Sequence, residues 1–204
     1  MNILEGILRE IELMKQAADE MQKGNNQTAL DIVNEVLSVN PMQWDACKWR
    51  GLIYATLGNY QKAIEDFNRA IDICLNDSHV DDSVTVDIYY YLGNVFESIY
   101  FVNELFESIE YLSRAVTIYD KIIQKYPKYI PARYRRGGIC YYLGMKADDG
   151  EELLQLAVKD FDFILENEPE NVDTTMKNDV IQKRNVARMM LLGDISWLPN
   201  DVDA

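Results

Sequence analysis

A period of 34 residues constrains this chain more than any other feature of its sequence. Between Trp44 and Leu75 the period is carried by glycine, alanine and aromatic residues, namely Gly51, Tyr54, Gly58, Tyr60, Ala63, Phe67 and Ala70. The positions 34 residues earlier again hold small or apolar residues, namely Ala17, Gly24, Ala29, Val33 and Val36. Self-similarity at such a period is typical of solenoid proteins, in which each repeat is one supersecondary unit. We therefore expect stacked units of helix, turn and helix.

The residue types within the unit explain why it must stack. Small residues at Gly51, Ala63 and Ala70 allow two antiparallel helices to approach closely, while Tyr54 and Phe67 fill the space between one pair and the next. One helix pair cannot bury its own apolar face, so the last pair needs a covering helix. An amphipathic stretch at about residues 172–192 is predicted to be that capping helix.

This pattern resembles the tetratricopeptide repeat, whose consensus is W-x-x-L-G-x-x-Y followed by Ala, Phe, Ala and Pro. Two further copies begin at Tyr89 and Tyr134, the last of them aligned on Gly138. The resemblance implies an all-α fold, a right-handed superhelix of about four helix-turn-helix repeats at residues 10–43, 44–77, 86–127 and 131–170. With the capping helix, a single solenoid is expected over residues 1–193, followed by a flexible tail at 194–204.

Local signals predict where the helices begin and end. Asn40 followed by Pro41 predicts a helix start, because Asn is a good N-cap and a proline at the first helical position loses no hydrogen bond. Two polar insertions, Asn76 to Ser83 and Gly144 to Glu152, are predicted to be exposed loops. The second helix of the third repeat is predicted to be extended, from about Leu105 to Lys125.

The charge and the cysteines exclude several classes of function. The formal net charge is -14, which repels nucleic acid and anionic membrane surfaces alike, so neither is an expected partner. No apolar run is long enough to span a membrane, and the first 13 residues mix charges into an amphipathic pattern unlike a signal peptide. The three cysteines lie far apart in apolar surroundings, as expected of reduced and buried thiols. These features predict a cytoplasmic protein.

Little in the sequence supports catalysis or metal binding. The only histidine, His79, lies in a polar insertion beside Asp77, Asp81 and Asp82, and the spacing lacks the glycine and terminal glutamate of an EF-hand loop. No phosphate-binding glycine motif is present. We therefore expect no enzyme activity, no metal site and no cofactor.

The resemblance also implies where a partner binds, because in this family the first helix of each repeat lines a concave groove. The positions that match the groove face include lysine, arginine and aromatic residues, and the last two types are enriched in binding hot spots. The predicted partner-binding residues are Lys48, Trp49, Tyr90, Tyr91, Asn94, Arg135, Arg136 and Tyr142. The alternatives are that the tyrosines pack between helices and that both arginines pair with acidic neighbours.

The best-known ligand mode of the family, a carboxylate clamp for chaperone C-termini, is not expected here. Lys48 and Arg136 match two of its five positions, whereas Leu52, Tyr91 and Ala132 replace the required polar residues. A ligand is instead expected to be held by aromatic contacts and a cationic anchor.

The function expected on these grounds is that of a protein-protein interaction module, an adaptor or scaffold that binds an extended peptide or helix of a partner. The alternative is a small acidic assembly or secretion chaperone that holds a client protein. We expect a monomer or a weak homodimer, and under the chaperone alternative the dimer would form through residues 1–21. In the tail, Trp197 and Leu198 are candidates to dock into a groove as a ligand mimic.

Overall fold

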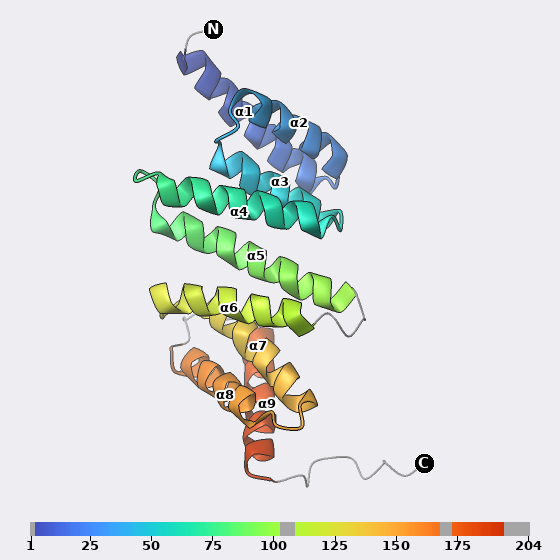
Figure 1. The fold of residues 1–204 in the computed structure, drawn as a ribbon, viewed down its shortest axis with the longest axis vertical. Helices are drawn as coiled ribbons and strands as arrows, with labels where there is room; N and C mark the ends of the chain where they lie inside the picture. Colours follow the sequence, from blue (N-terminus) through green and yellow to red (C-terminus); the bar gives the residue numbers. More distant parts are fainter. Residues whose placement is uncertain (1–2, 103–108, 168–172, 194–204) are drawn as a thin grey trace. The chain divides into compact units, whose positions relative to one another are not determined.

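The computed structural model describes residues 3–102, 109–167 and 173–193. All regular structure in these ranges is helical, and no strand occurs in them. The helices follow one another along the chain (Figure 1) as α1 (Ile3–Gln22), α2 (Asn26–Val39), α3 (Trp44–Thr56), α4 (Tyr60–Asn76), α5 (Asp82–Val102), α6 (Ile109–Lys125), α7 (Ile130–Lys146), α8 (Glu151–Glu166) and α9 (Thr174–Leu191). The all-α fold class predicted from the repeat period is therefore confirmed.

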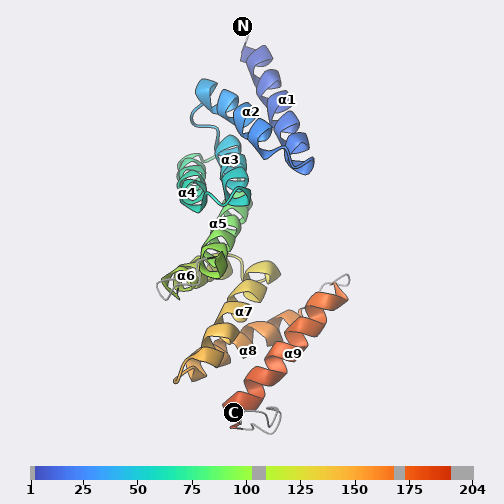
Figure 2. The ribbon, with the colours of Figure 1, turned by 90° about the vertical axis from the view of Figure 1, so that its right-hand side faces the viewer.

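The chain forms two compact units, Met1–Tyr111 and Leu112–Ala204. In the first unit α1 packs against α2, α3 packs against α4, and α2–α3 and α4–α5 contacts join the successive pairs. In the second unit α7 packs against α8, and α9 contacts both of these helices. Figure 2 shows the paired helices of each unit from a second direction.

The repeat positions form the core of the first unit. Ala29, Val33, Ala63, Phe67 and Ala70 are all fully buried, as the 34-residue period requires. The turns inside the two helix pairs contain Gly24 and Gly58, whose φ angles of 80° and 74° lie in the left-handed region that side chains other than glycine rarely adopt. The period thus specifies both the buried faces and the turns.

The core of the second unit includes the predicted capping helix. Cys140, Ala157, Phe161 and Ile164 of α7 and α8 form a buried cluster that Val180 of α9 completes. The side chain of Met176, also from α9, packs against the same cluster. Helix α9 therefore covers the apolar face of the last helix pair, and its bounds, Thr174–Leu191, fall within the predicted range.

The predicted helix start at Asn40 and Pro41 is wrong. Asn40 is instead the C-cap of α2, and its N–H donates to the carbonyl of Val36. The next helix, α3, begins at Trp44, with Gln43 as the N-cap whose side chain accepts a hydrogen bond from the N–H of Asp45. Proline therefore stands in the turn between the helices, which its fixed φ angle also suits.

The predicted exposed loop from Gly144 to Glu152 is shorter than expected, and its ends are buried. Helix α7 continues to Lys146 and α8 begins at Glu151. Gly144 and Gly150 are both buried, and a Cβ atom on Gly150 would lie 2.0 Å from the carbonyl oxygen of Gly144. These glycines let the two helix ends touch, so the prediction that this whole segment has no buried role was wrong.

The other predicted insertion is a short acidic turn between α4 and α5. Asp77 accepts a hydrogen bond from the N–H of His79, and Asp81 accepts one from the N–H of Ser83. The predicted start of the third repeat's second helix, near Leu105, lies outside the described residues, as does the tail with Trp197 and Leu198.

Candidate protein-binding surface

Helix α3 carries the first two predicted binding residues next to a second tryptophan. The Nζ atom of Lys48 lies 5.2 Å from the ring centroid of Trp44 and 5.7 Å from that of Trp49. The same Nζ atom is 2.6 Å from a carboxylate oxygen of Asp45 one turn earlier. Both Lys48 and Trp49 are half-buried, so each keeps a part of its surface exposed to solvent. The arrangement is an aromatic platform with a positive charge above it.

Helix α5, which contacts α3, carries three more predicted binding residues. The ring of Tyr91 stacks on Phe67 of α4 with a centroid separation of 6.2 Å and an interplanar angle of 19°, so one face of Tyr91 packs inward. Tyr90 meets Tyr91 edge to face at 6.2 Å, and Asn94 is half-buried on the same helix. The structure thus places five of the predicted residues on two neighbouring helices of the first unit, with Tyr91 serving partly as a packing residue.

The three remaining predicted residues lie on α7 in the second unit, and Arg136 differs from expectation. Its side chain is only 10% exposed, and its guanidinium forms ion pairs with Asp160 of α8 and Asp120 of α6. Burial would by itself lower the pKa of Arg136, but the hydrogen bonds to the two carboxylates raise it instead. The alternative of pairing with acidic neighbours therefore describes Arg136, and we remove it from the candidate surface.

Arg135 and Tyr142 remain partly exposed on α7. The hydroxyl of Tyr142 accepts a hydrogen bond from Lys146 one turn later, and the Nζ atom of that lysine lies 4.4 Å from the Tyr142 ring centroid. Tyr142 and Lys146 therefore repeat, in the second unit, the pairing of an aromatic ring with a lysine that α3 shows in the first.

Sequence reasoning missed an ion pair between an arginine and a buried aspartate that recurs in the second and fourth repeats. Arg50 binds both carboxylate oxygens of Asp66, at 2.8 and 2.6 Å, and Arg136 binds Asp160 at 2.7 Å through two of its nitrogens. The sequence does contain a signal for this pair. In each repeat the arginine directly precedes the glycine of the first helix that packs against a phenylalanine, and the aspartate directly precedes that phenylalanine on the second helix.

This pairing corrects the alignment of the fourth repeat. A Cβ atom on Gly51 would lie 2.9 Å from the ring of Phe67, and one on Gly137 would lie 2.9 Å from the ring of Phe161. A Cβ atom on Gly138 would meet nothing within 4 Å. Gly137 is therefore the packing glycine, and the alignment on Gly138 was wrong by one residue.

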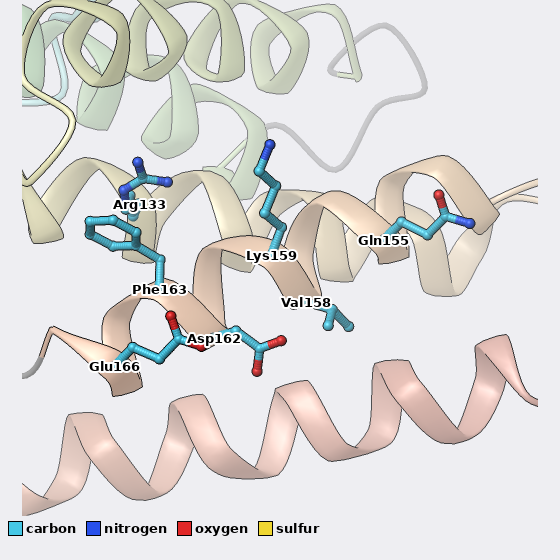
Figure 3. A pocket seen from close by; sticks show the side chains of 7 residues that line it. All are labelled: Arg133, Gln155, Val158, Lys159, Asp162, Phe163 and Glu166. Atoms are coloured by element: carbon cyan, nitrogen blue, oxygen red, sulfur yellow. The ribbon is translucent and has the colours of Figure 1, made fainter.

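The second unit also contains a surface pocket of about 450 Å3 along α8. Figure 3 shows its lining, in which the Arg133 guanidinium lies over the ring of Phe163 at 3.8 Å from the centroid. Arg133 also donates to Asp160 and to the carbonyl of Pro127, so its charge is used within the protein. The remaining lining residues, Gln155, Val158, Lys159, Asp162 and Glu166, mix both signs of charge and select no single ligand charge.

The described residues contain neither a cluster of metal-binding side chains nor an exposed thiol. Across residues 3–102, 109–167 and 173–193, no group of three or more histidine, cysteine, aspartate or glutamate side chains could hold a metal ion. All three cysteines are buried thiols, and burial raises the pKa of Cys140 to about 12, far above that of a reactive thiol. None of the helices in these ranges is both long enough and apolar enough to cross a membrane.

Comparison with known proteins agrees with this repeat architecture. The family profile for the tetratricopeptide repeat matches residues 15–82. Tetratricopeptide repeat protein 14 of Mus musculus is 33% identical over 64 residues, which are 31% of this chain and 8% of that protein's length. The chain thus spans a small part of this curated relative.

Solved structures share the fold over a larger part of the chain. MamA superposes with a TM-score of 0.59 at 24% identity, covering 78% of each chain. YrrB, described as a TPR protein with an unusual peptide-binding site, gives a TM-score of 0.61 at 16% identity, covering 90% of this chain and 77% of its own. A tetratricopeptide repeat protein from Parabacteroides merdae gives 0.62 at 17% identity, covering 94% of this chain and 68% of its own. Together with the repeated helix pairs, these matches show that the chain has the tetratricopeptide-repeat fold, and residues 15–82 also match the sequence profile of that family.

Proposed function

We propose that the chain is a protein-protein interaction module whose first unit binds an extended peptide or a helix of a partner on the face formed by α3 and α5. The observation that carries the proposal is the aromatic platform of α3, where Trp49 stays half-buried beside the charge of Lys48. Tryptophan is one of the residue types that are enriched at binding hot spots. The fold supports a binding role, since it is shared with YrrB, whose description names a peptide-binding site.

The α5 residues extend the proposed surface with polar and aromatic groups. Tyr90 and Asn94 lie one turn apart on α5 and are half-buried. A tyrosine offers a rigid ring and a hydroxyl, and an asparagine amide can donate to and accept from a peptide backbone. Tyr91 supports this face from beneath through its stacking on Phe67. We therefore propose that ring contacts hold the ligand and that the side-chain amide of Asn94 forms hydrogen bonds with its backbone.

A separate contact is proposed on α7, where Arg135 and Tyr142 are partly exposed. We assign Arg135 the role of an electrostatic contact for an acidic group of a partner. Arg136 is unsuitable for this role, because its guanidinium already binds two carboxylates. We also propose that the protein works in a reducing compartment such as the cytoplasm, where its three unpaired thiols persist.

The proposal is tested by measuring the affinity of a partner identified by affinity capture. Trp49→Ala should weaken binding about thirtyfold, which corresponds to about 2 kcal/mol for a hot-spot residue. Lys48→Ala should weaken binding less, because Asp45 already neutralises part of its charge. Both variants should melt like the parent protein, since neither side chain is fully buried.

Helix α4 offers matched controls for both variants. Lys62 lies over the ring of Tyr54 at 5.2 Å, an arrangement like that of Lys48, but on the second helix of the repeat. Tyr60 is a half-buried aromatic residue on the same helix. Lys62→Ala and Tyr60→Ala should bind the partner within twofold of the parent. If Trp49→Ala and Tyr90→Ala bind equally well, the α3–α5 face is not the binding surface.

A further inference from the structure

Helix α1 displays an apolar row that its own unit does not cover. Leu4, Ile7, Leu8 and Ile11 are 61%, 50%, 57% and 61% exposed. The spacing of three and four residues places these four side chains on one face of the helix. An amphipathic helix normally turns its apolar face toward the core. Among the described residues of α1, by contrast, the small side chain of Ala17 is fully buried, whereas the four large aliphatic side chains are exposed to solvent.

An acidic row lies beside the apolar row. Glu5, Glu12 and Asp19 recur every seven residues, which is close to two helical turns, so they lie on one side of α1. All three are exposed. Glu5 and Glu12 directly follow Leu4 and Ile11 of the apolar row, and Asp19 follows Ala18, which continues that row along the helix. A basic residue nearby, Arg9, is held by an ion pair with Glu35 of α2. The apolar row is thus bordered by negative charge on one side, and an exposed basic residue, Lys15, lies one turn beyond Ile11 on the same face.

We propose that this face of α1 binds an amphipathic helix of a partner protein, one whose apolar stripe is bordered by lysine or arginine. An apolar row of this kind selects a helix with apolar anchors three and four residues apart. The acidic row selects a basic border on that helix, because opposite charges at the rim steer association and fix the register. The site is distinct from the α3–α5 face and extends the proposed interaction function to a second surface.

Charge decides between this occupant and two others. A two-fold symmetric pair of copies would bring the same patch against itself, so acidic rows would lie at one interface between chains that each carry a formal charge of -14. An anionic membrane surface would repel the same row. Only a helix with a basic border satisfies both the apolar and the acidic rows.

The test uses three labelled helical peptides and fluorescence anisotropy with the full chain. The first peptide repeats a heptad with leucine at the a and d positions and lysine at e and g. The second has glutamate in place of lysine, and the third has the composition of the first in a scrambled order without a stripe. The basic striped peptide should bind at least tenfold more tightly than either of the others, because it alone matches both rows.

Variants then assign the binding to α1. Leu8→Glu should weaken the affinity for the basic striped peptide at least tenfold, whereas Leu75→Glu should leave this affinity unchanged. Leu75 is a suitable control, because it is 59% exposed on α4 and its replacement makes the same change in charge. Glu12→Lys with Asp19→Lys should shift the preference toward the acidic peptide, and Glu65→Lys with Asp72→Lys on α4 should not.

Several results would overturn the proposal. Equal effects of Leu8→Glu and Leu75→Glu would show that the acidic chain attracts the basic peptide without using α1. A dimer seen by sedimentation that Leu8→Glu dissociates would assign the row to a second copy. Binding to phosphatidylcholine vesicles that Leu8→Glu abolishes would assign it to a lipid surface. None of these readouts involves Trp49, so this proposal and the α3–α5 binding face fail independently.

Discussion

The second and fourth repeats place an arginine and a buried aspartate in the same structural position, although the two residues are separated by different lengths of sequence. Arg50 and Asp66 are 16 residues apart, whereas Arg136 and Asp160 are 24 residues apart. The extra residues are absorbed by a longer end of α7, by the turn in which Gly144 and Gly150 touch, and by a longer start of α8. The position relative to the packing glycine and phenylalanine, not the distance along the chain, therefore determines where the charges meet.

The two clusters differ in burial and in the number of charges. In the second repeat, Arg50 and Asp66 are 21% and 7% exposed, and the third partner is the neutral amide of Asn34. In the fourth repeat, Asp160 is fully buried between Arg133 and Arg136, and Arg136 also pairs with Asp120. A deeper cluster with more charges loses more when one member is removed, because the remaining charges have less access to water.

The largest expected effect is therefore that of Asp160→Asn. This change keeps the size of the side chain but leaves two nearly buried guanidinium groups with one carboxylate, that of Asp120. Breaking a buried ion pair on one side costs roughly 3 to 5 kcal/mol. We expect a loss of this size in the free energy of unfolding, measured by urea denaturation and circular dichroism.

Amide hydrogen exchange provides the control for this variant. Protection should fall in α7, α8 and α9, which share the core of the second unit, and should stay unchanged in α3 and α4. An Asp160→Asn protein that unfolds at the parent's urea concentration would show that the cluster contributes specificity without stability.

Asp66→Asn should cost less, about 1 to 3 kcal/mol. The guanidinium of Arg50 keeps its bond to Asn34 and is partly exposed, so water can replace some of the lost hydrogen bonding. The same urea denaturation experiment measures this loss in the free energy of unfolding. An equal or larger loss than that of Asp160→Asn would contradict the view that burial sets the difference between the two repeats.

The glycines beside these arginines give a smaller and opposite pair of effects. Gly137→Ala should destabilise the protein by about 1 to 2 kcal/mol, because the new Cβ atom would lie 2.9 Å from the Phe161 ring in a packed core. The new Cβ atom of Gly138→Ala would have no neighbour within 4 Å. This change should therefore stabilise the protein by up to about 1 kcal/mol, because alanine has a higher helix propensity than glycine. Thermal unfolding of both variants measures the difference. The opposite order would restore the alignment of the fourth repeat on Gly138.

The sequence predicted those features that depend on a strict period. Phe67, Ala63 and Ala70 are fully buried as expected, since their types recur at fixed spacing. The need of the last pair for a cover predicted α9, and Val180 fills that role. The repeat period and elementary packing therefore suffice for the fold.

Features that depend on single contacts across an insertion were not predictable. The burial of Arg136 follows from Asp160 on another helix, and an alignment shifted by one glycine hid the pair. The outward apolar row of α1, at Ile7 and its neighbours, was also missed, because an amphipathic pattern does not say which face meets the core. For Trp49, Tyr90 and Arg135 the structure supplies positions, and their binding role stays a prediction.

The smallest expected effect concerns the thiols of the two repeats at high pH. Burial raises the pKa of Cys140 to about 12, and the charge of Asp160 adds to the increase, whereas the thiol in the unfolded chain has its ordinary pKa of 9.0. Between these values the unfolded chain releases a proton that the folded chain keeps, so stability is full below pH 9 and falls as the pH rises toward 12. Between pH 8 and pH 10, ionisation of this thiol in the unfolded chain should lower the free energy of unfolding by about 1 kcal/mol.

Urea unfolding at pH 8, 9 and 10 under reducing conditions measures this dependence. Cys140→Ala should remove part of the slope with pH, whatever its effect on stability at pH 8. Cys47→Ala in the second repeat should remove less, because nearby Arg69 and Arg50 lower the pKa of Cys47 against the effect of burial. A slope should remain in both variants, since burial also raises the pKa of Tyr141. If Cys140→Ala keeps the full slope of the parent, the interior of the fourth repeat admits enough water to ionise its thiol, and the cluster around Asp160 is less isolated from solvent than its burial implies.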